Sequence, residues 1–227
     1  MLYLNENDIL KMGINWNETI DSIKKAVKCY AEGDYVQPIK PYLRYRDLKN
    51  RIIAMPAFLG GDFNISGIKW IASFPQNIDI GKQRASSIII LNNANTGEII
   101  SSINTSLISV IRTASVSGLM IKNYIKSTSK KDLTVGIVGW GPIGKYHFKM
   151  CHELLDDKVK QYCLYDLKGI DPNSIGNADK DKIKITDNWF EAYKDADIFV
   201  TCTVSNSRYI DQKPKDGALL LNVSLRD

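Results

Sequence analysis

The stretch that decides the fold runs from residue 133 to residue 144 and reads Leu-Thr-Val-Gly-Ile-Val-Gly-Trp-Gly-Pro-Ile-Gly. Its first half, residues 133–138, is apolar and rich in β-branched side chains, which is typical of a buried strand. The glycines that follow, Gly139, Gly141 and Gly144, have the spacing of a phosphate-binding turn that opens a helix. In such a turn the first glycine allows the tight bend, the second lets a ligand approach the backbone, and the third allows close packing of the helix. The stretch therefore predicts a dinucleotide cradle; the alternative is a glycine-rich turn that binds nothing.

A second short strand supports the cradle. Residues 161–165 are apolar and end at Asp166, the position from which a carboxylate accepts the ribose hydroxyls of a bound dinucleotide. A carboxylate there also repels the additional phosphate of NADP. The pair of segments therefore predicts NAD as the cofactor.

The C-terminal half of the chain alternates strands with helices. We expect strands at 133–138, 161–165, 183–186, 197–203 and 218–223, and helices at 143–155 and 188–195. This alternation predicts an α/β fold with a doubly wound parallel sheet of the Rossmann type and a cofactor at the carboxyl ends of its strands. Such a sheet normally continues beyond a central strand like 218–223 with a further strand and a covering helix, so we expect a truncated chain or a fragment.

The N-terminal half has a different pattern. Helices are expected at 6–12 and from Asn17, a plausible N-cap, to about Gly33, and strands at 39–45, 51–59, 65–73, 86–91 and 98–103. A long apolar helix at 106–125 and a polar linker at 126–131 follow. The half is therefore a mostly antiparallel α+β domain, and we place the domain boundary between residues 1–127 and residues 128–227.

Composition excludes several classes of protein. Hydrophobic residues make up 44% and charged residues 24% of the 227 positions, ordinary values for a globular protein. No apolar run approaches the roughly 20 residues that span a bilayer, and the N-terminus lacks a signal sequence, so we expect a cytoplasmic protein with no membrane partner. The four cysteines and two histidines have no metal-ligand spacing, and the net charge of +5 is dispersed, so we expect neither a metal site nor nucleic-acid binding.

Several further motifs occur in a characteristic order. They are Gly67-Ile-Lys69-Trp70, Phe74-Pro-Gln-Asn77, Ser109-Val-Ile-Arg112-Thr113-Ala-Ser-Val-Ser117, the glycine turn, Thr201-Cys202-Thr203, and Asn222 followed five residues later by Asp227. With these motifs the chain resembles the ornithine cyclodeaminase/μ-crystallin family of NAD(P)-dependent amine and imine enzymes over essentially its whole length. Residues 37–44, 51–56, 66–70 and 84–86 make it most similar to the siderophore-associated branch that makes L-2,3-diaminopropionate.

The resemblance implies roles for particular residues. Residues 1–127 would form a substrate-binding domain that also makes a homodimer, and residues 128–227 an incomplete NAD-binding domain. Lys69 and Asp227 would be catalytic, and the substrate would be bound by Arg44, Lys69 and Arg112, with Lys40 and Arg84 for additional carboxylates. The NAD pocket would comprise Ser86, Arg112, Thr113, Gly139, Gly141, Pro142, Ile143, Gly144, Asp166, Thr201, Cys202, Thr203 and Ser224.

The chemistry of these side chains fits an oxidation next to an amine. Arg44 and Arg112 can each bind a carboxylate through a planar fork, and Lys69 supplies a point charge and a proton donor. Asp227 would be the base that activates water for addition to an imine. Each residue also has a structural alternative: Arg112 as an ion-pair partner, Lys69 as an edge-strand lysine, and Asp227 as a frayed terminus. His147 we expect on a helix surface and Cys202 in the core beside the cofactor.

One departure from the family narrows the substrate. Ornithine cyclodeaminases carry an acid where this chain has Ile53, which argues against a diamine such as ornithine. The resemblance thus implies oxidative hydrolysis of an N-substituted α-amino acid with several carboxylates, N-(2-amino-2-carboxyethyl)-L-glutamate, to L-2,3-diaminopropionate and 2-oxoglutarate. Ornithine cyclodeamination or ketimine reduction is the second hypothesis. A non-catalytic NAD-binding or scaffold protein is the third, suggested by the expected truncation.

Overall fold

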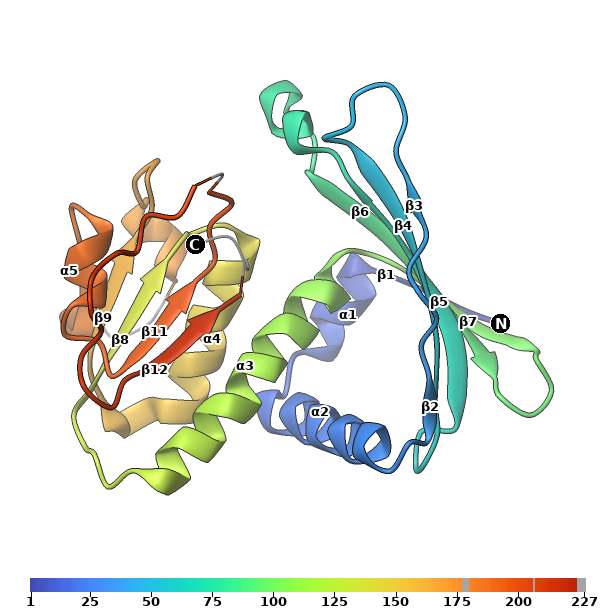
Figure 1. Ribbon diagram of the computed structural model, residues 1–227, viewed down its shortest axis with the longest axis horizontal. Helices are drawn as coiled ribbons and strands as arrows, with labels where there is room; N and C mark the ends of the chain where they lie inside the picture. The colour runs from blue at the N-terminus through green and yellow to red at the C-terminus, as the bar shows by residue number, and fades with distance from the viewer. Residues whose placement is uncertain (177–179, 206, 224–227) are drawn as a thin grey trace. The chain divides into compact units, whose positions relative to one another are not determined.

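The computed structural model describes residues 1–176, 180–205 and 207–223, and its chain divides into two compact units (Figure 1). The first unit comprises Met1–Asn15 and Asp21–Ser109, and the second comprises Trp16–Ile20 and Val110–Asp227. The expected domain boundary at residue 127 is the end of a helix, whereas the compact units divide within that helix, after Ser109. Within the described ranges, none of the helices combines the length and the apolar character that crossing a membrane requires.

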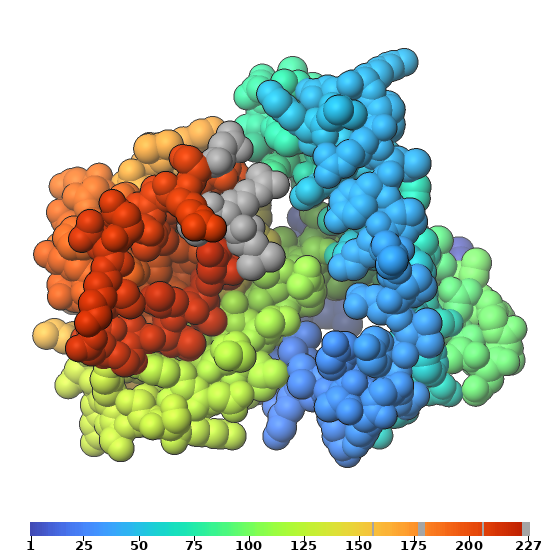
Figure 2. Space-filling view, in the orientation of Figure 1, coloured from blue at the N-terminus to red at the C-terminus, as the bar shows by residue number. Residues whose placement is uncertain are grey.

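The first unit is built on a sheet of seven strands. Its elements are β1 (Leu2–Asn5), α1 (Glu6–Met12), most of α2 (Trp16–Ala31), β2 (Tyr35–Val36), β3 (Tyr42–Leu43), β4 (Arg51–Leu59), β5 (Ile65–Ser73), η1 (Pro75–Ile80), β6 (Ala85–Asn93) and β7 (Ile99–Asn104). The strand order is β1-β7-β6-β5-β4-β2, with β3 also paired to β4. The segment that carries β2 and β3, in mid-blue, forms much of the surface of this unit in Figure 2.

The expected antiparallel character of this sheet is confirmed for the strands from β4 to β7. Two elements were not expected: β1 pairs in parallel with β7, and β2 adds a short strand beside β4. Asn5 ends β1 and caps α1, because its side chain accepts hydrogen bonds from the Asn7 and Asp8 N–H groups while the Asp8 carboxylate accepts from the Asn5 N–H. This capping box explains why the chain turns from strand to helix at that residue.

The second unit has the expected parallel sheet. Its elements are α3 (Leu107–Ser127, from Val110 onward), β8 (Leu133–Val138), α4 (Pro142–Leu155), η2 (Asp156–Lys158), β9 (Val159–Tyr165), η3 (Pro172–Ile175), η4 (Lys180–Lys182), β10 (Ile183–Ile185), α5 (Trp189–Tyr193), β11 (Ile198–Thr201) and β12 (Leu219–Asn222). All neighbouring strands are parallel, in the order β10-β9-β8-β11-β12. Instead of being central, β12 is the last strand of this order among the described residues.

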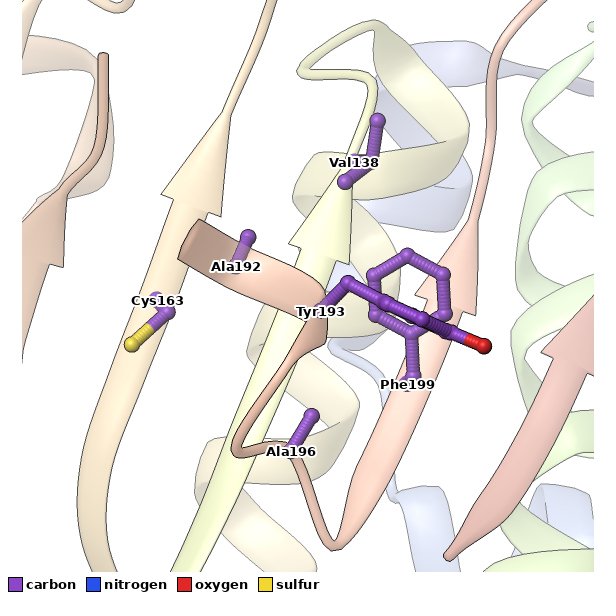
Figure 3. Packing of buried hydrophobic residues seen from close by; sticks show 6 residues of the cluster. All are labelled: Val138, Cys163, Ala192, Tyr193, Ala196 and Phe199. Atoms are coloured by element: carbon purple, nitrogen blue, oxygen red, sulfur yellow. The ribbon is translucent and has the colours of Figure 1, made fainter. Parts of the chain in front are cut away.

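Helices cover both faces of this sheet, with α4 on one side and α5 on the other (Figure 1). On the α5 side, the rings of Tyr193 and Phe199 meet edge to face, with their centroids 4.7 Å apart. The cluster is completed by Val138, Cys163, Ala192 and Ala196 (Figure 3). A strand buried between two helical layers needs apolar side chains on both faces, which is why β8 is a continuous apolar run.

The start of α2 belongs to the second unit. We expected Asn17 to cap this helix, but the helix begins at Trp16, so that expectation was wrong. The Trp16 side chain is buried, and its backbone N–H donates to the Glu153 carboxylate of α4 at 3.3 Å. The Thr19 hydroxyl further accepts from Ser115 of α3. Contacts distant in sequence therefore hold the start of this helix, and no local pattern could have predicted them.

Candidate dinucleotide and substrate site

The turn between β8 and α4 has the geometry of a phosphate cradle. Gly139 has a φ of +98°, and a Cβ placed there would lie 2.8 Å from the backbone carbonyl carbon of Cys202. A Cβ on Gly144 would lie 1.8 Å from the Gly139 oxygen, so this position must lack a side chain for α4 to pack on the turn. A Cβ on Gly141 would meet nothing within 4 Å. Two glycines are thus required by the fold, while the backbone at the third borders open space, where a ligand can approach it.

Asp166 is joined directly to this turn. One carboxylate oxygen accepts from the Trp140 N–H at 2.6 Å and the other from the Lys168 N–H at 2.9 Å. The Gly139 N–H donates to the Tyr165 carbonyl at 2.8 Å, which holds the end of β9 against the turn. An ionised carboxylate can accept about four hydrogen bonds, so Asp166 keeps acceptor capacity for two hydroxyls beyond its two backbone donors.

The turn lies where the sheet reverses its direction of winding. β8 has β9 on one side and β11 on the other, and the crevice between the carboxyl ends of such strands is the usual ligand position in this class of fold. Cys202 follows β11 directly, and its N–H donates to the Val138 carbonyl at 2.7 Å. Thr201 is buried, and its hydroxyl donates to the Asn222 side chain, whereas the Thr203 hydroxyl is 3.4 Å from that of Tyr209. The backbone of Cys202 and the Thr203 nitrogen both border the turn, since a Cβ on Gly139 would lie 2.8 Å from the first and 3.1 Å from the second.

These residues fit a dinucleotide. α4 has 14 residues and no acid in its first turn, so the positive end of its dipole is not offset by a local carboxylate. Pro142 occupies its first position, where the missing N–H costs nothing and the restricted φ favours the helix. Open backbone at Gly141 and a helix N-terminus offer hydrogen-bond donors for a pyrophosphate, and the Asp166 carboxylate offers an acceptor for the ribose hydroxyls.

Helix α3 carries the other expected residues of the second unit. Arg112 is exposed, Thr113 is half-buried, and Ser117, one turn later on the same face as Thr113, is buried. His147 of α4, which we expected on a helix surface, is completely buried, so that expectation was wrong. Its ring bonds Ser117, because this face of α4 packs against α3.

In the first unit, the expected substrate residues lie on and beside the sheet. Lys69 of β5 is half-buried, and its ammonium donates to the Ser109 hydroxyl at 3.2 Å. The register pairs Lys69 with Met55, and the Ala54 N–H donates to the Pro41 carbonyl, which places Lys40 next to Met55 in the same row. Lys40 and Lys69 therefore lie on one face of the sheet, two strands apart.

The remaining residues of that unit are more dispersed. Arg44 is exposed, stacks 5.5 Å from the Tyr42 ring and donates to the Leu48 carbonyl. Ser86 pairs with Ala72, three positions after Lys69 along β5. Side chains alternate between the two faces along a strand, so Ser86 lies on the face opposite Lys69. Arg84 precedes β6, where its carbonyl accepts from the Phe74 N–H. The structure thus brings Lys40 and Lys69 to one face but separates Ser86 from them.

Two expected residues, Ser224 and Asp227, lie outside the described residues. Among the residues that the structure does describe, no three His, Cys, Asp or Glu side chains are grouped so that they could hold a metal ion.

Comparison with known proteins adds an independent observation. Residues 5–224 match the model of the ornithine cyclodeaminase/mu-crystallin family. The whole chain is 36% identical to an N-((2S)-2-amino-2-carboxyethyl)-L-glutamate dehydrogenase of Staphylococcus aureus, covering 70% of that protein. Over 96% of the chain it is 26% identical to a Δ1-pyrroline-2-carboxylate reductase of Bacillus thuringiensis, covering 66% of it.

Among solved structures, the chain is similar to a Δ1-pyrroline-2-carboxylate reductase of Thermococcus litoralis in complex with NADH and L-proline. The TM-score is 0.76 at 23% identity, over 91% of this chain and 63% of that one. A likeness at this identity shows a shared fold, including the parallel sheet of the second unit. The chain spans between about three fifths and about seven tenths of the length of these relatives.

Proposed function

The chain belongs to the ornithine cyclodeaminase/mu-crystallin family, and on that premise we propose that it is an NAD-dependent oxidoreductase acting on the CH–NH bond of an amino acid. The substrate we propose is N-(2-amino-2-carboxyethyl)-L-glutamate. The observation that carries the proposal is the cradle in which Gly141 presents open backbone beside a carboxylate, in a chain 36% identical over its whole length to a dehydrogenase named for that substrate.

In this proposal the second unit binds the cofactor. The Gly141 backbone and the N-terminus of α4 would hold the pyrophosphate, and Asp166 would accept hydrogen bonds from the ribose hydroxyls. The two backbone N–H groups already bonded to Asp166 hold its carboxylate in one orientation, so little freedom is lost when the ribose binds. NAD⁺, when bound, accepts a hydride from the carbon next to the substrate nitrogen.

The first unit contributes cations for the substrate. The hydrogen bond from Lys69 to Ser109 fixes the direction of the ammonium, which supplies a point charge for the α-carboxylate and a proton donor. We assign Arg44 to the same carboxylate and Lys40, two strands from Lys69, to a second one. Ile53 pairs with Ile71 on the face of Lys69, so at this position the face offers an apolar side chain in place of an acid. That favours a substrate with several carboxylates over a diamine.

The proposed reaction balances in two steps. The glutamyl Cα–H bond gives its hydride to NAD⁺ and the nitrogen loses a proton, which leaves a C=N bond. Water then adds to this carbon and the C–N bond breaks, which releases 2-oxoglutarate and L-2,3-diaminopropionate. We assign activation of the water to Asp227.

A second candidate function is reduction of a cyclic imine. It is favoured by the 26% identity with the Bacillus reductase, over nearly the whole chain. The two functions differ in substrate and in the direction of hydride transfer, so a single experiment separates them.

We also propose that the chain forms a homodimer through its first unit. The face of the sheet opposite Lys69 carries Trp70, which is 40% exposed, in line with Ile88 of β6. An exposed aromatic side chain within an apolar row is typical of a protein interface. Light scattering of the purified chain should give twice the chain mass, and Trp70→Glu should give the mass of one chain; an unchanged mass in that variant would exclude this face.

The test of function is the appearance of NADH with NAD⁺ and N-(2-amino-2-carboxyethyl)-L-glutamate, with L-ornithine in parallel. We expect NADH with the first substrate alone. Lys69→Met, which keeps an unbranched side chain and removes the ammonium group, should lower kcat/KM by at least about 100-fold, because a charged contact with the carboxylate and a proton donor are lost. Turnover with ornithine, or consumption of NADH by a cyclic imine, would replace the proposal with the second candidate.

A further inference from the structure

The buried histidine of α4 has a defined hydrogen-bond arrangement. His147 has no exposed surface; its Nδ1 is 2.8 Å from the Ile143 carbonyl oxygen, and its Nε2 is 2.9 Å from the Ser117 hydroxyl. A carbonyl can only accept, so Nδ1 must carry the proton. In a neutral ring Nε2 then has a lone pair, and the Ser117 hydroxyl donates to it.

The ring is neutral under ordinary conditions. Burial lowers the pKa of His147 to about 4, although the backbone bond to Ile143 acts in the opposite direction. A neutral ring has a single N–H. The Ile143 carbonyl needs that N–H at Nδ1, and the Ser117 hydroxyl donates to the lone pair at Nε2, so both partners favour the same tautomer.

The Nδ1 end of this arrangement reaches the cradle, and the Nε2 end reaches α3. Ile143 is the second residue of α4, and Cys202, whose sulfur is 3.9 Å from Nδ1, has backbone atoms packed against Gly139. On the other side, Ser117 lies one turn after Thr113 on α3. One imidazole therefore connects α3, the first turn of α4 and the end of β11.

We propose that the Ser117–His147 pair is a positioning pair for the dinucleotide: it holds the Ile143 carbonyl and the Gly139–Cys202 contact in the arrangement that receives the pyrophosphate. This inference rests on the proposed cofactor site. If the Ser117 donor is removed, Nε2 becomes a buried acceptor that has lost its hydroxyl partner, and the ring loses one of the two hydrogen bonds that hold it against the Ile143 oxygen. The disturbance is thus transmitted to the cradle, although Ser117 does not belong to it.

The first test is the affinity for NAD⁺, measured by titration calorimetry on the purified chain. Ser117→Ala should raise Kd about tenfold, the free energy of roughly one buried hydrogen bond. Ser115→Ala is the matched control, because Ser115 is an equally buried serine of α3 that bonds Thr19 and its own helix but not α4. The control should keep Kd within about twofold, since it leaves the imidazole untouched. Equal Kd for Ser117→Ala and the unaltered chain would overturn the proposal.

The second test reads the tautomer without cofactor. The chain has two histidines, and His152 is exposed, so a long-range ¹H–¹⁵N spectrum contains two imidazoles, which a His152→Gln variant assigns. We expect a neutral His147 with its proton on Nδ1 in the unaltered chain and in Ser117→Ala, because the Ile143 carbonyl still accepts from Nδ1, and a shifted Nε2 resonance in the variant, because the Ser117 hydroxyl no longer donates to it. A proton on Nε2 in the unaltered chain would refute the inference. A chain that shows the expected tautomer but binds no NAD⁺ would instead refute the proposed function, so the two failures are distinguishable.

Discussion

Replacing Gly141 should separate cofactor binding from folding. A Cβ at this position meets nothing within 4 Å, and its backbone lies outside the left-handed region, so Gly141→Val is expected to change the free energy of unfolding by less than about 1 kcal/mol. The added side chain would occupy the space through which a pyrophosphate reaches the backbone. Two charge-assisted hydrogen bonds lost there, at about 1.5–3 kcal/mol each, correspond to a rise in Kd for NAD⁺ of roughly 10²- to 10⁴-fold.

The matched control is Gly144→Ala in the same turn. Its Cβ would lie 1.8 Å from the Gly139 oxygen, a backbone atom, so α4 must shift and we expect destabilisation by about 1–3 kcal/mol or more. Thermal unfolding followed by circular dichroism and calorimetric titration with NAD⁺ measure both quantities. Unaltered affinity in Gly141→Val would show that the cradle does not bind the dinucleotide. If Gly141→Val lost as much stability as the control, the claim that a side chain at position 141 has room would be refuted.

Three other predictions follow from the second unit. Asp166→Asn should reduce the preference for NAD⁺ over NADP⁺ by at least about tenfold, because the charge that repels the 2′-phosphate is removed; a preference as strong as before would assign the discrimination elsewhere. The folded-state pKa of His147 is about 4 against an ordinary 6.5, so the unfolded chain takes up the proton first as pH falls, and stability should drop by about 3 kcal/mol between those values. Urea unfolding at several pH values should show this loss in the unaltered chain and a smaller one in His147→Gln; equal slopes would contradict it. Burial alone would raise the pKa of the Asp197 carboxyl, but hydrogen bonds from Lys215 at 2.8 Å, the Thr134 N–H and Lys130 hold it below its ordinary value. Asp197→Asn should lower the free energy of unfolding by about 2 kcal/mol, a value between those for exposed and for buried ion pairs, because Asp197 is buried while both lysines are partly exposed; no change in urea midpoint would mean that the lysines contribute little.

Much of the fold could be predicted because its signals are local. β5 and β8 have the predicted bounds, since each is a continuous run of strand-forming residues between turn residues. β1 could not be predicted, because its four residues become a strand only by pairing with β7, about a hundred positions later in the chain. The start of α2 was wrong for a similar reason: Glu153, far away in the sequence, supplies the acceptor for the first N–H of the helix.

The cradle was predictable for the same reason as β8. The roles of Gly139 and Gly144 follow from their spacing, and the close approaches at both positions agree with it. The spacing does not reveal that Asp166 bonds the Trp140 N–H, nor that His147 is buried against Ser117, because these contacts depend on how neighbouring elements pack. Helical periodicity alone does not predict which residue His147 contacts. The only signal in the sequence was that Ser117 and His147 are polar residues among the apolar residues of their two helices.

In the first unit, the position of Lys69 could be predicted but not its surroundings. The motif around Lys69 gives the strand, whereas the hydrogen bond to Ser109 and the row shared with Lys40 depend on strand register. The separation of Ser86 from Lys69 is likewise a matter of register, because a shift by one residue changes the face on which a side chain lies.

The most direct test of the proposed function is the stoichiometry of products from N-(2-amino-2-carboxyethyl)-L-glutamate and NAD⁺. NADH is measured by absorbance, and 2-oxoglutarate and L-2,3-diaminopropionate by mass spectrometry of the same samples. Oxidative hydrolysis predicts equal amounts of the three compounds at every time point, and formation of all three at least about 100-fold slower with Lys69→Met. A folded chain that binds NAD⁺ but forms none of the three would contradict the proposed reaction and support a binding function.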